Sequence, residues 1–230
     1  MKLFPAPLHM PLETFIQQCT PLLPHAAGFH FDCMDNLFVK GSRWNIEEIN
    51  QLRMHSAFKN TSFWIHLMVQ NPEEYISKLN LFPGDTISFH FEALYGKHFP
   101  LSVTKNSQAF DKAEKIIESL EHKNVTASLA VNPETPFDAF KDLLFLVDHL
   151  LVMSVEPGLS GQPFLDATYE KLEEITAFIQ GHELSLTVAV DGGMNKQTID
   201  QLKNAGVDAV ALTSALFNTK DPIKALQDIV

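Results

Sequence analysis

Cysteine is scarce in this sequence, and long apolar runs are absent from it. Only 2 of the 230 residues are cysteine, so the chain does not resemble a small secreted protein held by a disulfide framework. No segment approaches the roughly eighteen apolar residues of a membrane helix, and prolines interrupt the N-terminal MKLFPAPLHMPLETF before a signal-peptide core could form. Basic residues are also few, 17 against 28 acidic ones, which disfavours nucleic acid or an anionic membrane as partner. We therefore expect a cytoplasmic protein.

What the sequence does contain is a repeated alternation of short apolar runs with amphipathic stretches of helical length. We expect the apolar runs to be strands, at residues 2–8, 29–34, 62–69, 86–93, 125–131, 149–155, 186–191 and 208–213. A candidate helix follows each run, near residues 12–22, 45–54, 72–80, 108–121, 137–146, 164–180, 196–204 and 221–229.

This pattern predicts an α/β fold, a (β/α)8 TIM barrel that forms a single domain over residues 1–230. The runs are mostly apolar rather than alternating, as in parallel strands that are covered on both sides. A chain of 230 residues is also the size of a compact barrel. A doubly wound open sheet fits less well, because no G-x-G-x-x-G motif follows the first strand. In a barrel, functional residues are expected where strands end and the following loops begin.

Two histidines and two carboxylates lie at the predicted carboxyl ends of strands. His30 and Asp32 are two residues apart and so point to the same side of their strand, His66 lies near the end of the third strand, and Asp191 closes the seventh. Each alone has an ordinary explanation, as a hydrogen-bonded core histidine or a turn residue. Together they form a set of two nitrogen and two oxygen ligands, which suits one divalent ion such as Zn²⁺, Fe²⁺, Mn²⁺ or Co²⁺. His90 could line the same site or fill a layer of the barrel.

The loops after the last three strands read EPGLSGQ, DGGM and LTSALF. Barrels bind phosphate in this sector through backbone amides and a helix N-terminus, and glycine allows the close approach. Two glycines after a strand are more often only a turn, but three such loops in succession predict a phosphate site. Its candidate residues are Gly158, Ser160, Gly161, Gly192, Gly193, Thr213 and Ser214.

Six segments resemble the ribulose-phosphate 3-epimerase family, almost from end to end: HFDCMDNLFV, HLMVQNPEEYI, SFHFEA, VNPETP, LVMSVEPGLSGQPF and VDGGMN. The allulose-6-phosphate 3-epimerases share these motifs, and NPETP, GQPF and TSALFN lean toward that branch. The resemblance implies a barrel that inverts C3 of a ketose phosphate with the help of one divalent metal ion. D-ribulose 5-phosphate, converted to D-xylulose 5-phosphate, is the nominal substrate, and D-allulose 6-phosphate is the alternative.

The resemblance also implies roles for individual residues. The four strand-end residues fall on the metal-ligand positions of the family, and Asp32 and Asp191 inherit its acid and base roles on opposite faces of the substrate. Met34, Met68 and Met153 match methionines that line the site, although core packing would explain each of them as well. Zn²⁺ is the expected ion, a sugar phosphate the expected partner, and a homo-oligomer the expected assembly.

The chain departs from the family where the substrate is contacted. Ala6 stands where the family has a serine, Leu212 stands where the last phosphate loop has a glycine, and NLFVKG at residues 36–41 replaces G-H-F-V-P-N. These changes suit an altered substrate preference or low activity, and they leave open a family member that binds metal without catalysis. The retained carboxylate pair favours catalysis, because a pure binder has no use for two opposed acid/base groups.

Overall fold

The structure is a computed structural model that describes residues 1–41, 43–95 and 107–229. Its strands are β1 (Lys2–Pro5), β2 (Phe29–Met34), β3 (Phe63–Met68), β4 (Thr86–His90), β5 (Thr126–Val131), β6 (His149–Met153), β7 (Thr187–Asp191) and β8 (Ala209–Leu212). Its α-helices are α1 (Leu12–Cys19), α2 (Ile46–Met54), α3 (Pro72–Lys78), α4 (Ser107–Glu121), α5 (Phe137–Phe140), α6 (Ala167–Gly181), α7 (Lys196–Asn204), α8 (Ser214–Phe217) and α9 (Pro222–Ile229). Short 3-10 helices are η1 (Thr20–His25), η2 (Ser56–Phe58), η3 (Glu92–Tyr95) and η4 (Lys141–Phe145). Within the described ranges, no helix is both long and apolar enough to cross a membrane.

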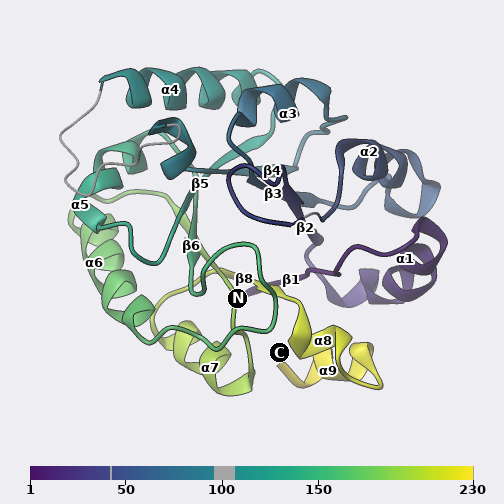
Figure 1. The fold of residues 1–230 in the computed structure, drawn as a ribbon. Helices are drawn as coiled ribbons and strands as arrows, with labels where there is room; N and C mark the ends of the chain where they lie inside the picture. Colours follow the sequence, from purple (N-terminus) through teal and green to yellow (C-terminus); the bar gives the residue numbers. More distant parts are fainter. Residues whose placement is uncertain (42, 96–106, 230) are drawn as a thin grey trace.

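The strands form one parallel sheet in the order β1-β8-β7-β6-β5-β4-β3-β2. Strands β1 and β2 therefore meet at a seam where the sheet curls almost closed, and the amide of Ala27 donates to the carbonyl of Leu3 there (3.0 Å). Figure 1 looks along the barrel and shows the helices arranged around the strands. The predicted (β/α)8 TIM barrel is confirmed.

Several element boundaries differ from those predicted. The first strand stops at Pro5 rather than residue 8, although the Ala6 amide still donates to the Leu212 carbonyl beyond it (2.9 Å). The predicted helix at 137–146 is a single α-turn, α5, followed by η4. The sixth helix starts at Ala167 rather than 164, since the Leu165 amide still donates to the Ser154 carbonyl at the end of β6 (2.9 Å). Helix α8 was not predicted.

Local sequence signals account for two helix starts. Helix α2 begins with a capping box, in which Asn45 Oδ1 accepts from the Glu48 amide (2.9 Å) and Glu48 Oε2 accepts from the Asn45 amide (3.0 Å). Asn195 and Thr198 make the same reciprocal arrangement at α7 (3.1 and 2.8 Å). Helix α7 is thus fixed directly after the β7 loop, which carries two candidate site residues.

The barrel interior is filled by side chains, including a polar ladder. His149 Nδ1 lies 2.8 Å from Ser128 Oγ, the Ser128 and Ser88 hydroxyls are 2.7 Å apart, and Trp64 Nε1 donates to Ser88 Oγ (2.7 Å). The Trp64 ring also packs edge-on against the His30 ring, with centroids 4.4 Å apart. This packed layer therefore supports the His30 ring from the barrel interior.

A buried ion pair joins α2 to the amino ends of β3 and β4. Arg53 Nη2 pairs with Asp85 Oδ1, and the two side chains are only 1% and 2% exposed. Asp85 also accepts from the amides of Phe63 (2.9 Å) and Phe82 (2.8 Å). The Arg53 guanidinium donates to the Thr61 carbonyl (2.8 Å) and lies 3.6 Å above the Phe63 ring centre. The pair thus links a helix to two strands at the end of the barrel opposite the candidate site.

Candidate active site

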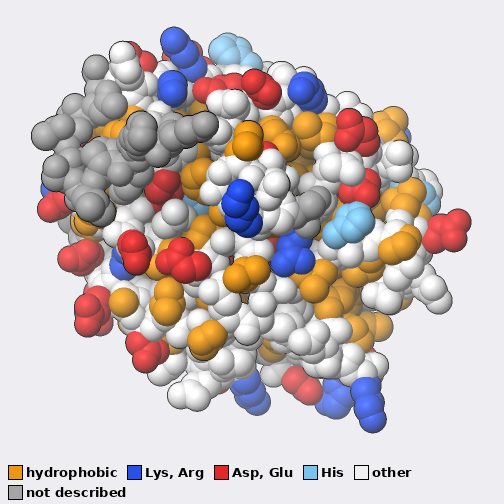
Figure 2. Space-filling model, in the orientation of Figure 1, with side chains coloured by type: hydrophobic (Ala, Val, Ile, Leu, Met, Phe, Trp, Pro, Cys, Tyr) orange, Lys and Arg blue, Asp and Glu red, His pale blue; other side chains and the backbone are white. Residues whose placement is uncertain are grey.

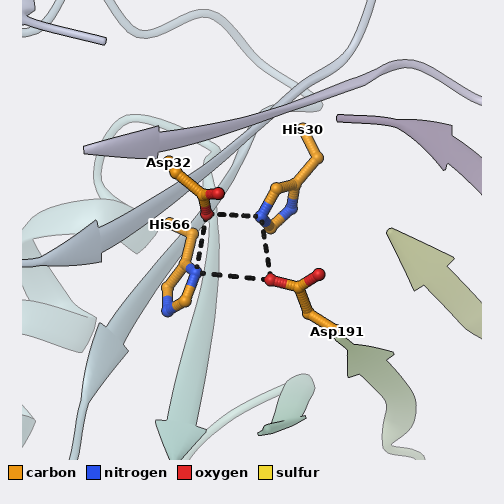
Figure 3. A group of neighbouring side chains, drawn as sticks. All are labelled: His30, Asp32, His66 and Asp191. Atoms are coloured by element: carbon orange, nitrogen blue, oxygen red, sulfur yellow. Dashed lines mark hydrogen bonds and ion pairs between the residues drawn. The ribbon is translucent and has the colours of Figure 1, made fainter. Parts of the chain in front are cut away.

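The four strand-end residues come together at the carboxyl end of the barrel. Strand β2 supplies His30 and Asp32, β3 supplies His66, and Asp191 is the last residue of β7. One ligand atom from each lies within 4.8 Å of all the others. Figure 3 shows nitrogen and oxygen alternating around this cluster, with the two carboxylates at opposite corners.

The distances suit a shared cation. Asp32 Oδ1 lies 3.2 Å from both His30 Nε2 and His66 Nδ1. Asp191 Oδ2 lies 3.7 Å from His30 Nε2 and 3.9 Å from His66 Nδ1. Two imidazole nitrogens and two carboxylate oxygens facing one point are a donor set that fits Zn²⁺ and related divalent ions. The cluster is therefore able to hold a metal.

The surroundings push the two carboxyl pKa values apart. Burial raises the pKa of Asp191 to about 7, opposed by the charge of His30 and assisted by that of Asp32. Burial acts on Asp32 in the same direction, but its close polar contacts with His30 and His66 outweigh it and hold the Asp32 pKa well below its ordinary value. Burial lowers the pKa of His66 to about 4, so this ring is neutral near pH 7. Paired groups with separated pKa values are typical of acid/base sites.

A cleft opens above the cluster. Asp32 and Asp191 line it, whereas the side chains of His30 and His66 are fully buried beneath. The carboxylates are thus the cluster members that a bound molecule would meet. The cleft is also lined by Met68, Met153 and all the predicted phosphate-binding residues: Gly158, Ser160, Gly161, Gly192, Gly193, Thr213 and Ser214.

The glycine pair after β7 is required by close packing. A Cβ on Gly193 would lie 2.5 Å from the Phe164 amide nitrogen, and one on Gly192 would lie 2.4 Å from Val155 Cγ2. Both glycines have positive φ, 112° for Gly192 and 62° for Gly193, which favours glycine in any case. The Gly192 amide donates toward the Asp191 carboxylate. This turn therefore presses the β7 loop against the β6 loop and orients Asp191.

The β2 loop keeps an ordered shape despite its unusual sequence. Asp35 Oδ1 accepts from the amides of Leu37 and Phe38 (2.8 Å each), and its Oδ2 accepts from the Gln70 amide (2.6 Å). Asn36 has φ 59° and its Oδ1 accepts from a later amide of the loop (3.1 Å). Asparagine is among the residues that best tolerate this left-handed conformation, so its presence in place of the family glycine does not disrupt the turn.

Three residues expected to line the site are not among those lining the cleft. Met34 lies under the loops, with its Cε 3.4 Å from the Cβ position of Gly158. Ala6 is buried in one cluster with Met153. His90 is fully buried and contacts His66 from behind. All three side chains are buried.

Sequence analysis missed two residues near the cluster. Arg43, which follows the β2 loop, is half-buried and is the one basic side chain among the described residues that line the cleft. Glu92 is buried and lies against His90. A signal for Glu92 was present, because residues two apart at a strand end share one side, but Arg43 lies in a segment without a recognisable pattern.

Comparison with protein families gives a match to the Ribulose-phosphate 3 epimerase family over residues 22–217. The ribulose-phosphate 3-epimerase of Aquifex aeolicus is 30% identical over 84% of this chain and 78% of its own. The ribulose-phosphate 3-epimerase of Schizosaccharomyces pombe is 29% identical over 87% of this chain and 79% of its own. The enzyme of the same name from Methanocaldococcus jannaschii is 29% identical over 87% of this chain and 77% of its own. These relatives share most of their length with this chain.

Solved structures with similar folds are more distant in sequence. KGPDC from Streptococcus mutans, determined in complex with D-R5P, has a TM-score of 0.68 at 14% identity and covers 99% of this chain and 94% of its own. A 3-hexulose-6-phosphate synthase has a TM-score of 0.64 at 11% identity, and the match covers 100% of this chain and 98% of its own. At these identities the likeness shows the fold alone.

Proposed function

The chain belongs to the ribulose-phosphate 3-epimerase family, and on that basis we propose that it interconverts D-ribulose 5-phosphate and D-xylulose 5-phosphate. Membership makes it an isomerase, an epimerase of carbohydrate phosphates. The observation that carries the proposal is the position of Asp32 and Asp191, which face each other across the cluster and both line the cleft.

Inversion at C3 needs acid/base groups on both faces of the substrate. One carboxylate takes the C3 proton, and the electron pair of the broken C–H bond moves toward the C2 carbonyl oxygen to give an enediolate. The other carboxyl returns a proton to C3 from the opposite face, and the electron pair re-forms the C2 carbonyl. Asp32 and Asp191 are proposed as this pair, and they exchange roles in the reverse direction.

The cluster residues are proposed to hold one divalent ion, for which Zn²⁺ is the expected choice and Fe²⁺, Mn²⁺ and Co²⁺ are alternatives. The fit rests on His30, Asp32, His66 and Asp191, whose ligand atoms converge within 4.8 Å. When bound, such an ion supplies Lewis acidity that stabilises negative charge on substrate oxygens. The side chains themselves orient the reacting carbon between the two carboxylates.

The phosphate of the substrate is proposed to lie at the far end of the cleft, against the loops after β6, β7 and β8. All seven predicted residues of that group line the cleft. Gln162 supports the β6 loop, since its Nε2 donates to the carbonyls of Glu156 (2.6 Å) and Leu159 (2.9 Å).

Proton exchange at C3 tests the proposal. The metal-reconstituted enzyme is mixed in D₂O with ribulose 5-phosphate and, separately, with allulose 6-phosphate, and NMR follows the C3 proton. We expect faster exchange with ribulose 5-phosphate. Faster exchange with allulose 6-phosphate would assign the chain to the hexulose phosphate branch. No exchange with either sugar, in protein that binds one ion, would contradict an epimerase activity.

Arg43→Met is expected to raise the KM for the sugar phosphate by about 10-fold, with a smaller change in kcat. A charged hydrogen bond contributes about 1.5–3 kcal/mol, and Arg43 is the one basic group lining the described cleft of a chain with net charge −11. In Figure 2, some Lys and Arg side chains lie near the middle of this face, while others lie toward its rim together with most of the Asp and Glu side chains. Steady-state kinetics and inhibition by inorganic phosphate measure the effect.

Lys40→Met is the matched control for this variant. Lys40 is an exposed basic residue of the same loop and does not line the cleft, so its loss should change KM by less than about twofold. Equal effects of the two changes would show a general electrostatic influence instead of a contact by Arg43.

We further propose that residues 1–230 form one domain that acts in the cytoplasm as a homo-oligomer. Cys19 and Cys33 are free and buried, which is compatible with a reducing compartment. Exposed apolar side chains such as Met54 (70%) and Phe145 (52%) are candidates for subunit contacts. Light scattering of the purified protein gives the assembly state, and limited proteolysis tests the single domain.

A further inference from the structure

A row of buried polar side chains runs from His66 away from the cleft. His66 Nε2 lies 2.8 Å from His90 Nε2, and His90 Nδ1 lies 3.1 Å from Glu92 Oε2. His66 and His90 are fully buried, and Glu92 is 6% exposed. Three neighbouring elements, β3, β4 and η3, supply them. The row places a carboxylate behind one member of the metal-binding cluster.

Glu92 is held as an acceptor. Its Oε1 accepts from the amide of Asn132 (2.8 Å) and from the hydroxyl of Thr135. The loop that carries these donors is fixed in turn by Lys171, whose Nζ donates to the Asn132 carbonyl (2.8 Å). Burial acts to raise the pKa of Glu92, but the hydrogen bond with His90 and the two loop donors leave it below its ordinary value. The ionised carboxylate offers only acceptor atoms.

The acceptor role of Glu92 then determines the direction of the hydrogen bonds from Glu92 through His90 to His66. Because Glu92 only accepts, His90 Nδ1 is the donor in their contact, and with the ring proton on that nitrogen His90 Nε2 is left as the acceptor toward His66. His66 must then carry its proton on Nε2, which leaves a lone pair on Nδ1. That lone pair points at the carboxylates of Asp32 and Asp191, where the cluster converges. A metal ligand needs this tautomer, since the bond to the ion uses the lone pair.

The opposite tautomer of His66 has a partner of its own. Its Nδ1 lies 3.2 Å from Asp32 Oδ1, so a proton on Nδ1 would be held by that carboxylate and would block the ligand atom. His30 provides a contrast, because its outer nitrogen, Nδ1, is buried and has no hydrogen-bond partner among the described residues. Of the two histidines, His66 is the one whose outer nitrogen is linked to a carboxylate.

We propose that Glu92 is a positioning residue that acts through His90 to select the Nε2–H tautomer of His66, and so keeps Nδ1 open for a divalent cation. Phe38 of the β2 loop covers His90, with ring centroids 4.8 Å apart. The proposal rests on the metal-binding part of the proposed function and not on the identity of the sugar phosphate.

The test uses the metal-free, full-length protein and Zn²⁺ alone, without substrate. Long-range ¹H–¹⁵N spectra of the imidazole rings report which nitrogen carries the proton, and we expect Nε2 for His66. Glu92→Gln, which can donate as well as accept, should remove this preference and weaken Zn²⁺ binding by about 10- to 100-fold, the range known for outer partners of ligand histidines. Competition with a chromophoric chelator measures the affinity, and His30 serves as the internal reference in the spectra.

Glu134→Gln is the matched control, because Glu134 is an exposed neighbour of Thr135 and the change removes the same charge. It should alter neither the His66 spectrum nor Zn²⁺ affinity. A wild-type His66 with its proton on Nδ1 would overturn the proposal, and this measurement needs no variant to fold. Wild-type Zn²⁺ affinity in Glu92→Gln would overturn it as well. Expected results here, together with absent epimerase activity, would support this proposal and count only against the proposed function.

Discussion

Asp191→Asn is expected to abolish epimerisation while leaving the barrel intact. Asparagine keeps the shape of aspartate but cannot accept or return a proton near neutral pH, so one face of C3 loses its acid/base group. Removal of a general acid or base costs about 10²- to 10⁴-fold in rate, and we expect kcat to fall within that range. Steady-state kinetics of the Zn²⁺-loaded variant measure the loss, and circular dichroism checks the fold.

Isotope exchange makes this prediction more specific. With Asp32 still in place, the Asp191→Asn enzyme should exchange the C3 proton of one epimer with D₂O without forming the other epimer. Asp32→Asn should show the opposite preference. The Zn²⁺ content of each variant has to be measured, since both residues belong to the cluster proposed to hold the metal. Asp200→Asn, on the exposed face of α7, is the control and should keep wild-type turnover. Near-normal turnover of Asp191→Asn would contradict the acid/base assignment.

Arg53→Met is expected to lower stability more than other changes away from the site. It leaves the Asp85 carboxylate, 2% exposed, without its cation, and breaking a buried ion pair on one side costs about 3–5 kcal/mol. For a protein of this length each kcal/mol corresponds to about 2–4 °C, so Tm should fall by roughly 10 °C. Denaturant and thermal unfolding give the two quantities.

Two further variants identify the cause of this loss. Adding Asp85→Asn should recover part of the stability, because the unpaired charge is then removed as well. Lys224→Met breaks an exposed pair with Asp228, whose side chains are 68% and 60% exposed, and should have no measurable effect. An Arg53→Met protein as stable as wild type would contradict a stabilising role for the pair.

The positions of the cluster residues were predictable because the carboxyl ends of parallel strands all lie at the same end of the barrel. A residue at the carboxyl end of one strand must lie near those of its neighbours, so His30, Asp32, His66 and Asp191 could be assigned to one site from strand limits alone. The glycine loops could be placed for the same reason. Their glycines, however, serve packing as well, as Gly193 does against Phe164, and sequence alone does not distinguish that use from phosphate binding.

Long-range contacts were beyond prediction from the sequence. Arg53 and Asp85 are 32 residues apart, and each alone is an ordinary charged residue near the end of an element. Arg43 lines the cleft after the β2 loop, which turns through Asn36 with a left-handed backbone. The link from Glu92 to the cluster depends on donors from the β5 loop, 40 or more residues away. Such partners are selected by tertiary packing, which local pattern does not encode.

The seam between β1 and β2 gives the metal-binding cluster a second significance. His30 and Asp32 lie on β2, at one end of the hydrogen-bonded strand order, and Asp191 lies on β7, close to the other end. An ion held by these residues would link β2 to β7 across the seam at which the barrel closes. The sheet could then open at the seam only by losing a ligand, so a bound ion would stabilise the closed barrel through the same atoms that are proposed to perform the chemistry.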